Sequence, residues 1–473
     1  MRKTKIICTI GPASESAEIL RELVLTGMNV ARLNFSHGTH EEKTAVINRL
    51  CAIRGELQKP LALLADTKGP EIRLGIIPGG SVELSRGQSF TLTTAECEGN
   101  KDRAHVDYAG LPGDVTAGDR ILLDDGLIEL RIDCVNGTEI DCTVLNGGPI
   151  SSKKGVNLPE VKVRLPYISK QDLADLRFIA SRPFSYVAAS FTRTAADIRE
   201  IRKELKRYGG ENIKIIAKIE NAEGVQNIGS ILEAADGIMV ARGDLGVELS
   251  LKEMPVLQKK LIQNAYRRGM PVITATQMLE SMIHNPRPTR AETSDVANAV
   301  YDGTSAVMLS GETAAGAYPV EACRYMSEIS EYAESDIDYH KRFLTREYAL
   351  ESTVTNAVAH AAVMIAYELS CKAILTMTES GTTARHISKF RPASPIIACT
   401  PSDKTYHQLA LLWGVTPLMI PECESTDALT SVSTAAAIKA RLLEEGDMTV
   451  ITAGIPLGQA GATNFLNVYV MEK

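Results

Sequence analysis

Short apolar runs alternate with helix-length amphipathic segments in two stretches of the chain, residues 1–69 and 167–340. Apolar runs of about four to eight residues, rich in β-branched side chains, are typical of strands buried on both faces of a parallel sheet. Eight such runs occur: KIICTI near Ile6, NVARLNF near Val30, LALLAD near Leu63, YVAASF near Val187, IKIIAKIE at 213–220, GIMVARGD, PVITATQ and AVMLSGE.

These eight runs, most of them followed by a helical segment, predict an α/β fold in which residues 1–69 and 167–340 form a closed parallel (β/α)8 TIM barrel. An open, doubly wound sheet is the competing arrangement. The number of runs and the polar ending of nearly every run favour the barrel, and we expect it to be the catalytic domain.

Residues 70–166 have a different pattern. The segments VELSRGQSFTLTT, ILLDDGLIELRI and EIDCTVL alternate apolar and polar residues with period two, and turn signals such as Val135-Asn136-Gly137 separate them. We therefore predict a small β-barrel domain inserted into a loop of the TIM barrel. Such an insert lies over the C-terminal mouth of the barrel, where it can act as a lid.

Residues 341–473 return to alternating helical and apolar segments. A long helix is expected at 352–370, and the later runs predict strands: CKAILTM, PIIACT, VTPLMI, MTVITA and NVYVM. This region is predicted to be a separate C-terminal α/β domain with a regulatory role.

Composition adds few constraints. Among 473 residues, 44% are hydrophobic and 23% charged, with a net charge of −7, so no global field favours nucleic acid or an anionic membrane. The N-terminus lacks a signal-peptide core, and no apolar run approaches the roughly 20 residues of a membrane span. Nine scattered cysteines without a C-x-x-C pair suit a reducing cytoplasm, and the eight histidines form no zinc motif.

The run from Ile213 to Glu220 carries two charges at its end. Lys218 and Glu220 share one strand face, because side chains two residues apart point the same way. A lysine and a carboxylate at the end of a buried strand are costly unless each has a partner. Taken alone, the pair has two interpretations: a structural ion pair, or part of a functional site.

Other strand ends carry polar groups as well. The second run ends with Arg32, Asn34 and Ser36 on one side, and the third ends with Asp66 and Thr67, which are hard oxygen ligands. For the second run, the alternative is a strand end satisfied by solvent and the following turn.

Asp244 ends the sixth run beside Glu220 of the neighbouring strand. Two converging carboxylates are the usual protein share of a magnesium site, although Asp244 could instead cap the following helix. The seventh and eighth runs end with Thr276 and Ser310, whose hydroxyls could bind a substrate carboxylate, relay a proton or cap helices.

These polar residues become more informative as a set. All are predicted at the C-terminal ends of barrel strands: Arg32, Asn34, Asp66, Thr67, Lys218, Glu220, Asp244, Thr276 and Ser310. Fold stability alone would not require polar groups at every mouth position. The set favours the functional interpretation of Lys218 and Glu220 and predicts a site for a small, strongly anionic, phosphorylated substrate.

A second candidate site lies in the C-terminal domain. Thr378, Ser380, Gly381, Thr382 and Thr383 follow a predicted strand and open a helix, an arrangement that can bind phosphate through hydroxyls and backbone N–H groups. The glycine-rich loop 454–461 could close over the same ligand, or could be a flexible turn.

The residues resemble a known family, the pyruvate kinases. The resemblance is carried by CTIGP, NVARLNFSHG, LADTKGPEIR, KKGVNLP, AKIEN, MVARGDLGVE, ITATQMLESM, NPRPTRAE and VMLSGETAAGAYP, and it covers nearly the whole chain. It is closest to bacterial forms, because no extra N-terminal arm or further C-terminal domain is visible. It implies Mg²⁺- and K⁺-dependent phosphoryl transfer from phosphoenolpyruvate to ADP, which gives pyruvate and ATP, the last step of glycolysis.

The resemblance also implies roles for single residues. Lys218 would hold the transferring phosphoryl group and stabilise the enolate, Arg32 would contact the phosphate, and Thr276 would assist protonation of the enolate carbon. The remaining roles are Mg²⁺ (or Mn²⁺) binding by Glu220 and Asp244, receipt of the substrate carboxylate by the backbone of Gly243 and Asp244, K⁺ binding by Asn34, Ser36, Asp66 and Thr67, and nucleotide contacts from Asn34, Arg73 and Lys154.

Three further expectations follow from the resemblance. The acid at Glu71 predicts a potassium requirement, since family members with a lysine there replace the ion's charge. The loop 378–383 occupies the position of an effector phosphate, from a sugar phosphate or a nucleotide. The family is usually homotetrameric. We also expect Lys218 and Glu220 to be held apart by a shared substrate rather than joined in a salt bridge.

Two other functions are weighed against this one. A magnesium-dependent lyase or aldolase acting on a 2-oxo acid would use paired carboxylates on a barrel and a Schiff base at Lys218. A catalytically silent sugar-phosphate sensor would depend on the C-terminal domain alone. Against the sensor, every catalytic position of the family is filled as expected.

Overall fold

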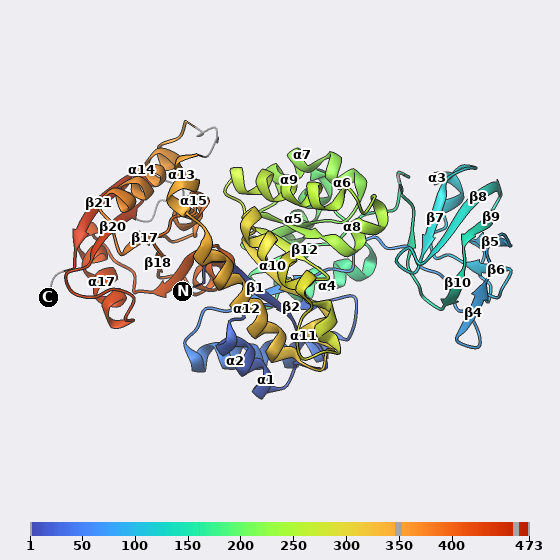
Figure 1. Cartoon of the computed structure of the whole chain (residues 1–473), viewed down its shortest axis with the longest axis horizontal. Helices are drawn as coiled ribbons and strands as arrows, with labels where there is room; N and C mark the ends of the chain where they lie inside the picture. The colour runs from blue at the N-terminus through green and yellow to red at the C-terminus, as the bar shows by residue number, and fades with distance from the viewer. Residues whose placement is uncertain (1, 160, 346–351, 457–462, 472–473) are drawn as a thin grey trace.

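The computed structural model describes residues 2–159, 161–345, 352–456 and 463–471. Three bodies lie in a row: the C-terminal domain at one end, an α/β barrel in the middle and an all-β insert at the other end (Figure 1). No helix in these ranges is long and apolar enough to cross a membrane.

The central body is a closed barrel of eight parallel strands in the order β1-β16-β15-β14-β13-β12-β3-β2. Its strands are β1 (Lys5–Thr9), β2 (Val30–Asn34), β3 (Ala62–Asp66), β12 (Tyr186–Ala189), β13 (Lys214–Ile219), β14 (Gly237–Ala241), β15 (Val272–Ala275) and β16 (Ala306–Leu309). Each lies within one of the eight apolar runs. The predicted barrel is therefore confirmed, and the open sheet is excluded.

Helices surround this barrel (Figure 1). They are α1 (Ala17–Thr26), α2 (His40–Leu57), α4 (Lys170–Ala180), α5 (Ala195–Arg207), α6 (Ala222–Gln226), α7 (Ile228–Ala234), α8 (Arg242–Glu248), α9 (Met254–Arg267), η1 (Glu280–Ile283), α10 (Arg290–Asp302), α11 (Gly311–Ala314) and α12 (Pro319–Asp336). Capping boxes fix several starts, as at Thr39 and Glu42 for α2.

The alternation of side chains along each strand decides which of them point toward the barrel axis. On β13, Ile215, Ala217 and Ile219 pack into the cluster beneath the helices, whereas Ile216 belongs to the cluster inside the barrel. Side chains alternate along a strand, so Lys218 shares the inward side with Ile216. The fold itself turns this lysine toward the barrel interior.

The insert carries its own apolar core. Its elements are β4 (Ser81–Leu84), β5 (Ser89–Thr93), β6 (Arg103–His105), α3 (Leu111–Asp114), β7 (Arg120–Leu123), β8 (Ile128–Asn136), β9 (Glu139–Asn146), β10 (Gly148–Ser151) and β11 (Val156–Asn157). They form a six-stranded sheet, β11-β7-β8-β9-β5-β6, and a two-stranded ribbon, β10-β4, curled as a half-barrel. The predicted turn at Val135-Asn136-Gly137 joins β8 to β9, with Gly137 at a φ of 63°.

The C-terminal body is a five-stranded sheet in the order β19-β18-β17-β20-β21, flanked by helices. Its elements are α13 (Tyr339–Leu344), α14 (Val354–Glu368), β17 (Ala373–Met377), α15 (Thr382–Lys389), β18 (Ile396–Thr400), α16 (Asp403–Gln408), η2 (Leu409–Leu411), β19 (Val415–Met419), α17 (Thr426–Lys439), β20 (Met448–Ala453) and β21 (Phe465–Val470). The five predicted strands and the long helix are confirmed, and β21 runs antiparallel to β20.

The C-terminal domain also closes the base of the barrel. Ala410 and Leu411 of η2 belong to the same buried cluster as the inward-facing side chains of the barrel strands. The Tyr186 hydroxyl donates a hydrogen bond of 2.6 Å to the carbonyl of Gln408, which fixes this segment below β12. The two domains therefore share part of one apolar core.

Candidate active site

The centre of the candidate site is Lys218, at the C-terminal end of β13. Its Nζ lies 3.0 Å from Asp66 Oδ1 and 2.9 Å from Glu220 Oε1, and it donates to Ser190 Oγ at 2.8 Å. These partners come from three adjacent strand ends, β3, β12 and β13. The barrel thus brings together charges that are more than 150 positions apart in the chain.

Mutual neutralisation keeps Asp66 and Lys218 of this cluster ionised. Burial alone would raise the pKa of Asp66, but the charges of Arg32 and Lys218 outweigh burial and hold that pKa below its usual value. Burial would likewise lower the pKa of Lys218, but Asp66 and Glu220 outweigh it and raise that pKa above its usual value. At neutral pH, Lys218 is therefore a fixed ammonium aimed into the mouth of the barrel.

One sequence-based expectation about this lysine is wrong for this structure. We expected Lys218 and Glu220 to be held apart by a shared substrate, and instead they form an ion pair at 2.9 Å. The physical reason is burial, since Glu220 is only 1% exposed and a buried charge without a partner is costly.

Glu220 and Asp244 form the second part of the site. Burial raises the pKa of Glu220 to about 7, with Asp244 adding to the rise while Lys218 opposes it. Burial also raises the pKa of Asp244. Two carboxyl groups that favour protons suit a divalent cation, because the cation would supply the positive charge that otherwise comes from protons.

The backbone orients this carboxylate pair. The Phe191 N–H donates to Glu220 Oε2 at 2.6 Å, which fixes one oxygen and leaves the other beside Lys218. Among the described residues, no group of three or more His, Cys, Asp or Glu side chains is arranged to hold a metal. The protein share of a cation site at this mouth would therefore be Glu220 and Asp244.

Arg32 joins the cluster from β2. Its Nε donates to Asp66 Oδ2 at 2.6 Å and its Nη1 to Thr9 Oγ1 at 2.9 Å. The guanidinium and the Lys218 ammonium thus grip opposite oxygens of one carboxylate. Two cations fixed in this way create a preorganised positive field that suits an anionic group.

Ser190, which follows β12, was missed by the sequence reasoning. Its hydroxyl contacts Asp66 Oδ1 at 3.0 Å and the Thr67 carbonyl at 2.7 Å, and it accepts from Lys218. The signal was present, because Ser190 ends the fourth apolar run just as Arg32 and Asp66 end the second and third. Thr9, at the end of the first run, was missed in the same way.

Thr276 is held in an unusual backbone conformation. Its φ is 68° and that of Gln277 is 52°, both in the left-handed region that disfavours side chains. Arg242 donates to the Thr276 carbonyl through Nη2 at 2.6 Å and to Asp295 Oδ2 through Nη1 at 2.6 Å. The Gly243 N–H donates to Thr276 Oγ1 at 2.8 Å, so these two residues, each predicted separately to contact the substrate, lie side by side.

Asn34, Ser36, Asp66 and Thr67 lie at the neighbouring ends of β2 and β3. Asn34 pairs with Asp66 in the strand register, and Asn34 Oδ1 accepts from the Ser36 N–H at 3.0 Å. Thr67 Oγ1 accepts from the Ser190 N–H at 3.2 Å. The four predicted ligands therefore gather around one edge of the mouth, with Asp66 shared with the Lys218 cluster.

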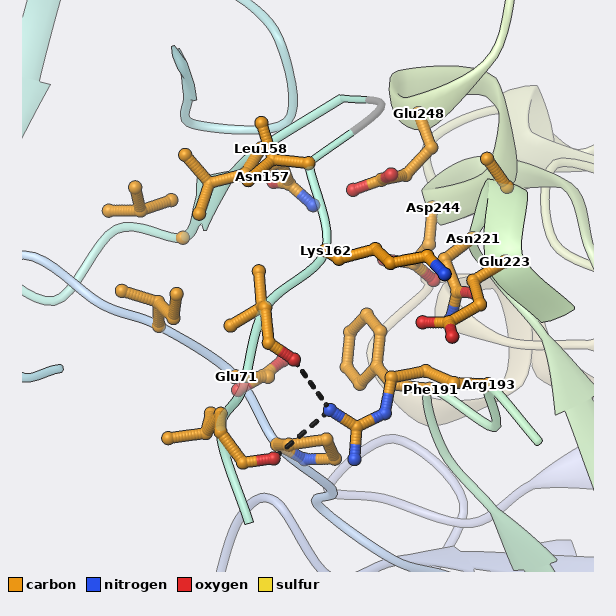
Figure 2. A pocket seen from close by; sticks show the side chains of 18 of the residues that line it. Glu71, Asn157, Leu158, Lys162, Phe191, Arg193, Asn221, Glu223, Asp244 and Glu248 are labelled. Carbon is orange, nitrogen blue, oxygen red and sulfur yellow. Dashed lines mark hydrogen bonds between the residues drawn. The ribbon is translucent and has the colours of Figure 1, made fainter. Parts of the chain in front are cut away.

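A cavity of about 620 Å³ separates the insert from the barrel mouth. Arg73 and Lys154, two of the three predicted nucleotide contacts, line it together with Asp244, one of the two predicted Mg²⁺ ligands, whereas the third predicted nucleotide contact, Asn34, is not part of the lining. Figure 2 shows Lys162 projecting into the cavity and Arg193 hydrogen-bonding to the carbonyls of Val163 and Leu165, at 3.1 and 3.0 Å. These bonds tie the returning end of the insert to the loop after β12.

Comparisons with known proteins identify the family to which this chain belongs. The family model described as "Pyruvate kinase, barrel domain" matches residues 1–323, and the one described as "Pyruvate kinase, alpha/beta domain" matches residues 356–469. The chain belongs to the pyruvate kinase family. Among its relatives, "Pyruvate kinase" of Staphylococcus saprophyticus is 50% identical over 474 residues, and that of Staphylococcus aureus strain USA300 is 49% identical over 473.

Both alignments cover all of this chain and 81% of the relative. The chain is accordingly an enzyme with pyruvate kinase activity, which decides against the aldolase and sensor alternatives. The charge state of Lys218 agrees, because a Schiff base requires a neutral amine and the carboxylates raise the pKa of this one. Glu71 also lines the cavity, and its carboxylate pairs with Arg73 at 2.7 Å.

The loop predicted to bind an effector lies at the other end of the molecule from the insert. Thr378 Oγ1 accepts from the Gly381 N–H at 2.9 Å, and Thr383 Oγ1 accepts from Thr463 Oγ1 at 2.9 Å. Ser380, Gly381 and Thr382 instead line a separate cavity. In the glycine-rich loop 454–461, residues 457–461 lie outside the described ranges.

Proposed function

We propose that the cluster at the barrel mouth transfers a phosphoryl group from phosphoenolpyruvate to ADP, with Mg²⁺ (or Mn²⁺) and K⁺ as cofactors. The observation that carries this proposal is the convergence of Lys218 and Arg32 on Asp66, beside the paired carboxyl groups of Glu220 and Asp244. Phosphoryl transfer needs alignment and compensation of negative charge more than covalent chemistry, and this cluster is built from fixed charges.

The cations have separate tasks in this proposal. Lys218 holds the transferring phosphoryl group and then stabilises the enolate oxygen, and Arg32 contacts the phosphate. Support comes from their preorganisation, because each already donates to a buried carboxylate and needs little reorientation. The backbone N–H groups at Gly243 and Asp244 receive the substrate carboxylate, and Thr276 lies beside them to assist protonation of the enolate carbon.

The nucleotide occupies the cavity beneath the insert. Arg73 and Lys154 contact its phosphates, which is supported by their places in the lining opposite Asp244. Asn34 is the third nucleotide contact proposed. When bound, a divalent cation held by Glu220 and Asp244 would neutralise and align the phosphate oxygens.

A potassium ion is held by Asn34, Ser36, Asp66 and Thr67 in this proposal. Their oxygens gather at the adjoining ends of β2 and β3, and Glu71 places an acid, not a lysine, on the lid side. We expect the steady-state rate to rise strongly with KCl. The measurement compares potassium-free buffer, with tetramethylammonium chloride as the matched salt, against ~100 mM KCl at equal ionic strength. Equal rates in the two buffers would reject the potassium site.

The assignment of the whole site is tested by pyruvate formation from phosphoenolpyruvate and ADP in a coupled assay containing Mg²⁺ and K⁺. Borohydride with pyruvate serves as the counter-test. Labelling of Lys218 would indicate Schiff-base chemistry, whereas the phosphoryl-transfer roles predict an unlabelled lysine together with turnover.

Two larger-scale features complete the proposal. The loop 378–383 binds the phosphate of a sugar-phosphate or nucleotide effector, supported by its place before α15. The chain assembles as a homotetramer, supported by β21, whose Val468 and Val470 are exposed at the edge of the sheet. Light scattering on the purified enzyme should give four times the chain mass, and a monomer would contradict the assembly.

A further inference from the structure

Lys162 lies on the segment through which the chain returns from the insert to the barrel, and it projects into the cavity beneath the insert (Figure 2). Its neighbours along the chain hold it there. Val161, Val163 and Leu165 pack against the apolar core of the insert. Arg193 of the barrel donates to the carbonyls of Val163 and Leu165, at 3.1 and 3.0 Å. The backbone beside Lys162 is therefore fixed from both domains.

Lys162 differs from the other cations that line this cavity. The others are already paired with acids: Arg73 with Glu71 at 2.7 Å, Lys154 with Asp124 at 2.8 Å, and Arg193 with Asp197 at 3.5 Å. Within the described part of the chain, Lys162 forms no ion pair. It is exposed, so solvent stabilises its charge until a ligand binds. Its ammonium is therefore available to an anionic ligand.

Carboxylates outnumber cations in the lining of the cavity. They belong to Glu71, Asp124, Asp125, Glu223, Asp244 and Glu248. A polyphosphate therefore enters against negative charge, which bound metal and each unpaired cation have to offset. Figure 2 shows the ammonium of Lys162 directed toward the side of the cavity that carries Glu223 and Asp244. The unpaired cation thus faces the side on which compensation is most needed.

The position of Asp244 indicates which phosphate Lys162 meets. Asp244 lines the cavity and is also among the charges that raise the pKa of Lys218, so it lies where the nucleotide cavity joins the Lys218 cluster. In the proposed reaction, the phosphoryl group leaves the enol oxygen of phosphoenolpyruvate and bonds to a β-phosphate oxygen of ADP. The accepting β-phosphate therefore has to occupy this junction.

We propose that Lys162 is a further contact for the β-phosphate of ADP, supplied by the insert, and that it sets the affinity of the enzyme for this nucleotide. This inference rests on the proposed function and adds a cation to the nucleotide site. A lysine suits the task, because its ammonium is a point charge with three donors on a flexible stem and can follow the phosphate as the new bond forms. Lys162 takes up no proton in this step.

The test is isothermal titration of the full-length enzyme with ADP in the presence of MgCl2 and KCl, together with the KM for ADP and for phosphoenolpyruvate. Lys162→Gln removes the charge at nearly constant length, and Lys162→Arg restores it. Lys154→Gln is the comparison at a nucleotide contact already proposed. Lys101→Gln is the matched control, an exposed lysine of the insert outside the cavity. Titration with MnCl2 alone reports on the carboxylate pair without nucleotide.

We expect Lys162→Gln to raise the Kd and the KM for ADP about tenfold, because a charge-assisted hydrogen bond is lost, while Lys162→Arg and Lys101→Gln stay close to the parent. The KM for phosphoenolpyruvate and the affinity for Mn²⁺ should not change. Parental ADP affinity in Lys162→Gln, with a loss in Lys154→Gln, would overturn the inference and leave the nucleotide site standing. Altered Mn²⁺ affinity with unchanged ADP affinity would show that Lys162 acts on the carboxylates instead. A parent enzyme that does not bind ADP would overturn the proposed nucleotide site as well.

Discussion

Lys218 is surrounded at the barrel mouth by residues that stabilise its positive charge. Asp66 and Glu220 stabilise its charge, and Ser190 accepts a third hydrogen bond from its ammonium. A lysine in this position is a fixed positive charge rather than a nucleophile, because its carboxylate neighbours raise its pKa. The contribution to catalysis that we propose for it is therefore electrostatic.

Replacing Lys218 by Met should lower kcat by on the order of 10³-fold or more, since it removes the ammonium that is proposed to contact the phosphoryl group. Mn²⁺ binding, followed by water proton relaxation, should persist because Glu220 and Asp244 remain. Lys206→Met is the matched control on an exposed helix. A variant that turns over at nearly the normal rate would refute the role assigned to Lys218.

Arg242 is a positioning residue for Thr276. It holds the Ala275 and Thr276 carbonyls and pairs with Asp295, which keeps Thr276 in its left-handed conformation. Arg242→Lys retains the charge but not the forked donation, so kcat should fall about 10–100-fold with little change in the KM for ADP.

Exchange of pyruvate methyl protons in D2O, followed by NMR, separates this role from a purely structural one. We expect Arg242→Lys and Thr276→Val to slow exchange together, whereas Arg49→Lys on α2 leaves it unchanged. Normal exchange in Arg242→Lys, with reduced kcat, would show that Arg242 does not act through Thr276.

At the scale of elements, the ends of the barrel strands have opposite uses. Their C-terminal ends carry the charged cluster, while the base is closed by apolar residues of η2 from the C-terminal domain. Leu411 is fully buried inside the barrel although it belongs to the C-terminal domain. The C-terminal domain thus contributes to the stability of the barrel and is also a candidate effector domain.

Leu411→Ala should therefore destabilise the barrel, by roughly 2–5 kcal/mol, because it leaves a cavity in a close-packed interior. The measurement is the denaturant midpoint of the barrel transition. Leu25→Ala, on the exposed face of α1, is the control and should have little effect. A barrel transition unchanged by Leu411→Ala would mean that the domains unfold independently.

At the scale of the whole molecule, His407 joins the two large domains. Its Nδ1 accepts a hydrogen bond from the Leu61 N–H at 3.2 Å, just before β3. Burial, aided by the charge of Arg54, lowers the pKa of His407 to about 4, although Asp403 opposes the shift. The folded protein therefore keeps this imidazole neutral at the domain junction.

This shift predicts acid sensitivity. The unfolded chain binds a proton on His407 below its ordinary pKa of about 6.5, and the folded chain does not until about pH 4. Stability should consequently fall as pH drops from 6.5 toward 4. His407→Asn keeps an acceptor near Leu61 but cannot titrate, so its Tm should fall by several degrees less than the parent's between pH 7 and pH 5. His284→Asn, on the surface, should follow the parent, and equal slopes for parent and His407→Asn would contradict the assignment.

Much of the fold could be predicted from local pattern. The eight apolar runs became the eight barrel strands, and period-two alternation in 70–166 became the insert, because these patterns reflect burial on two faces or on one. Ser190 and Thr9 escaped prediction although they also end strands. The positioning role of Arg242 was not predicted, because it depends on the backbone conformation of Thr276, which no sequence pattern indicates.

The sequence by itself determined which residues end each apolar run, and therefore which polar side chains point into the mouth of the barrel. Alternation along a strand makes this a local property, since Lys218 must lie on the side of Ile216. Only the tertiary structure decided that Lys218 and Glu220 pair, that Arg32 shares Asp66 with Lys218, and that the 380–382 loop faces Lys214 across a cavity. These are contacts between distant segments, fixed by barrel closure and domain packing rather than by any neighbouring residues in the chain.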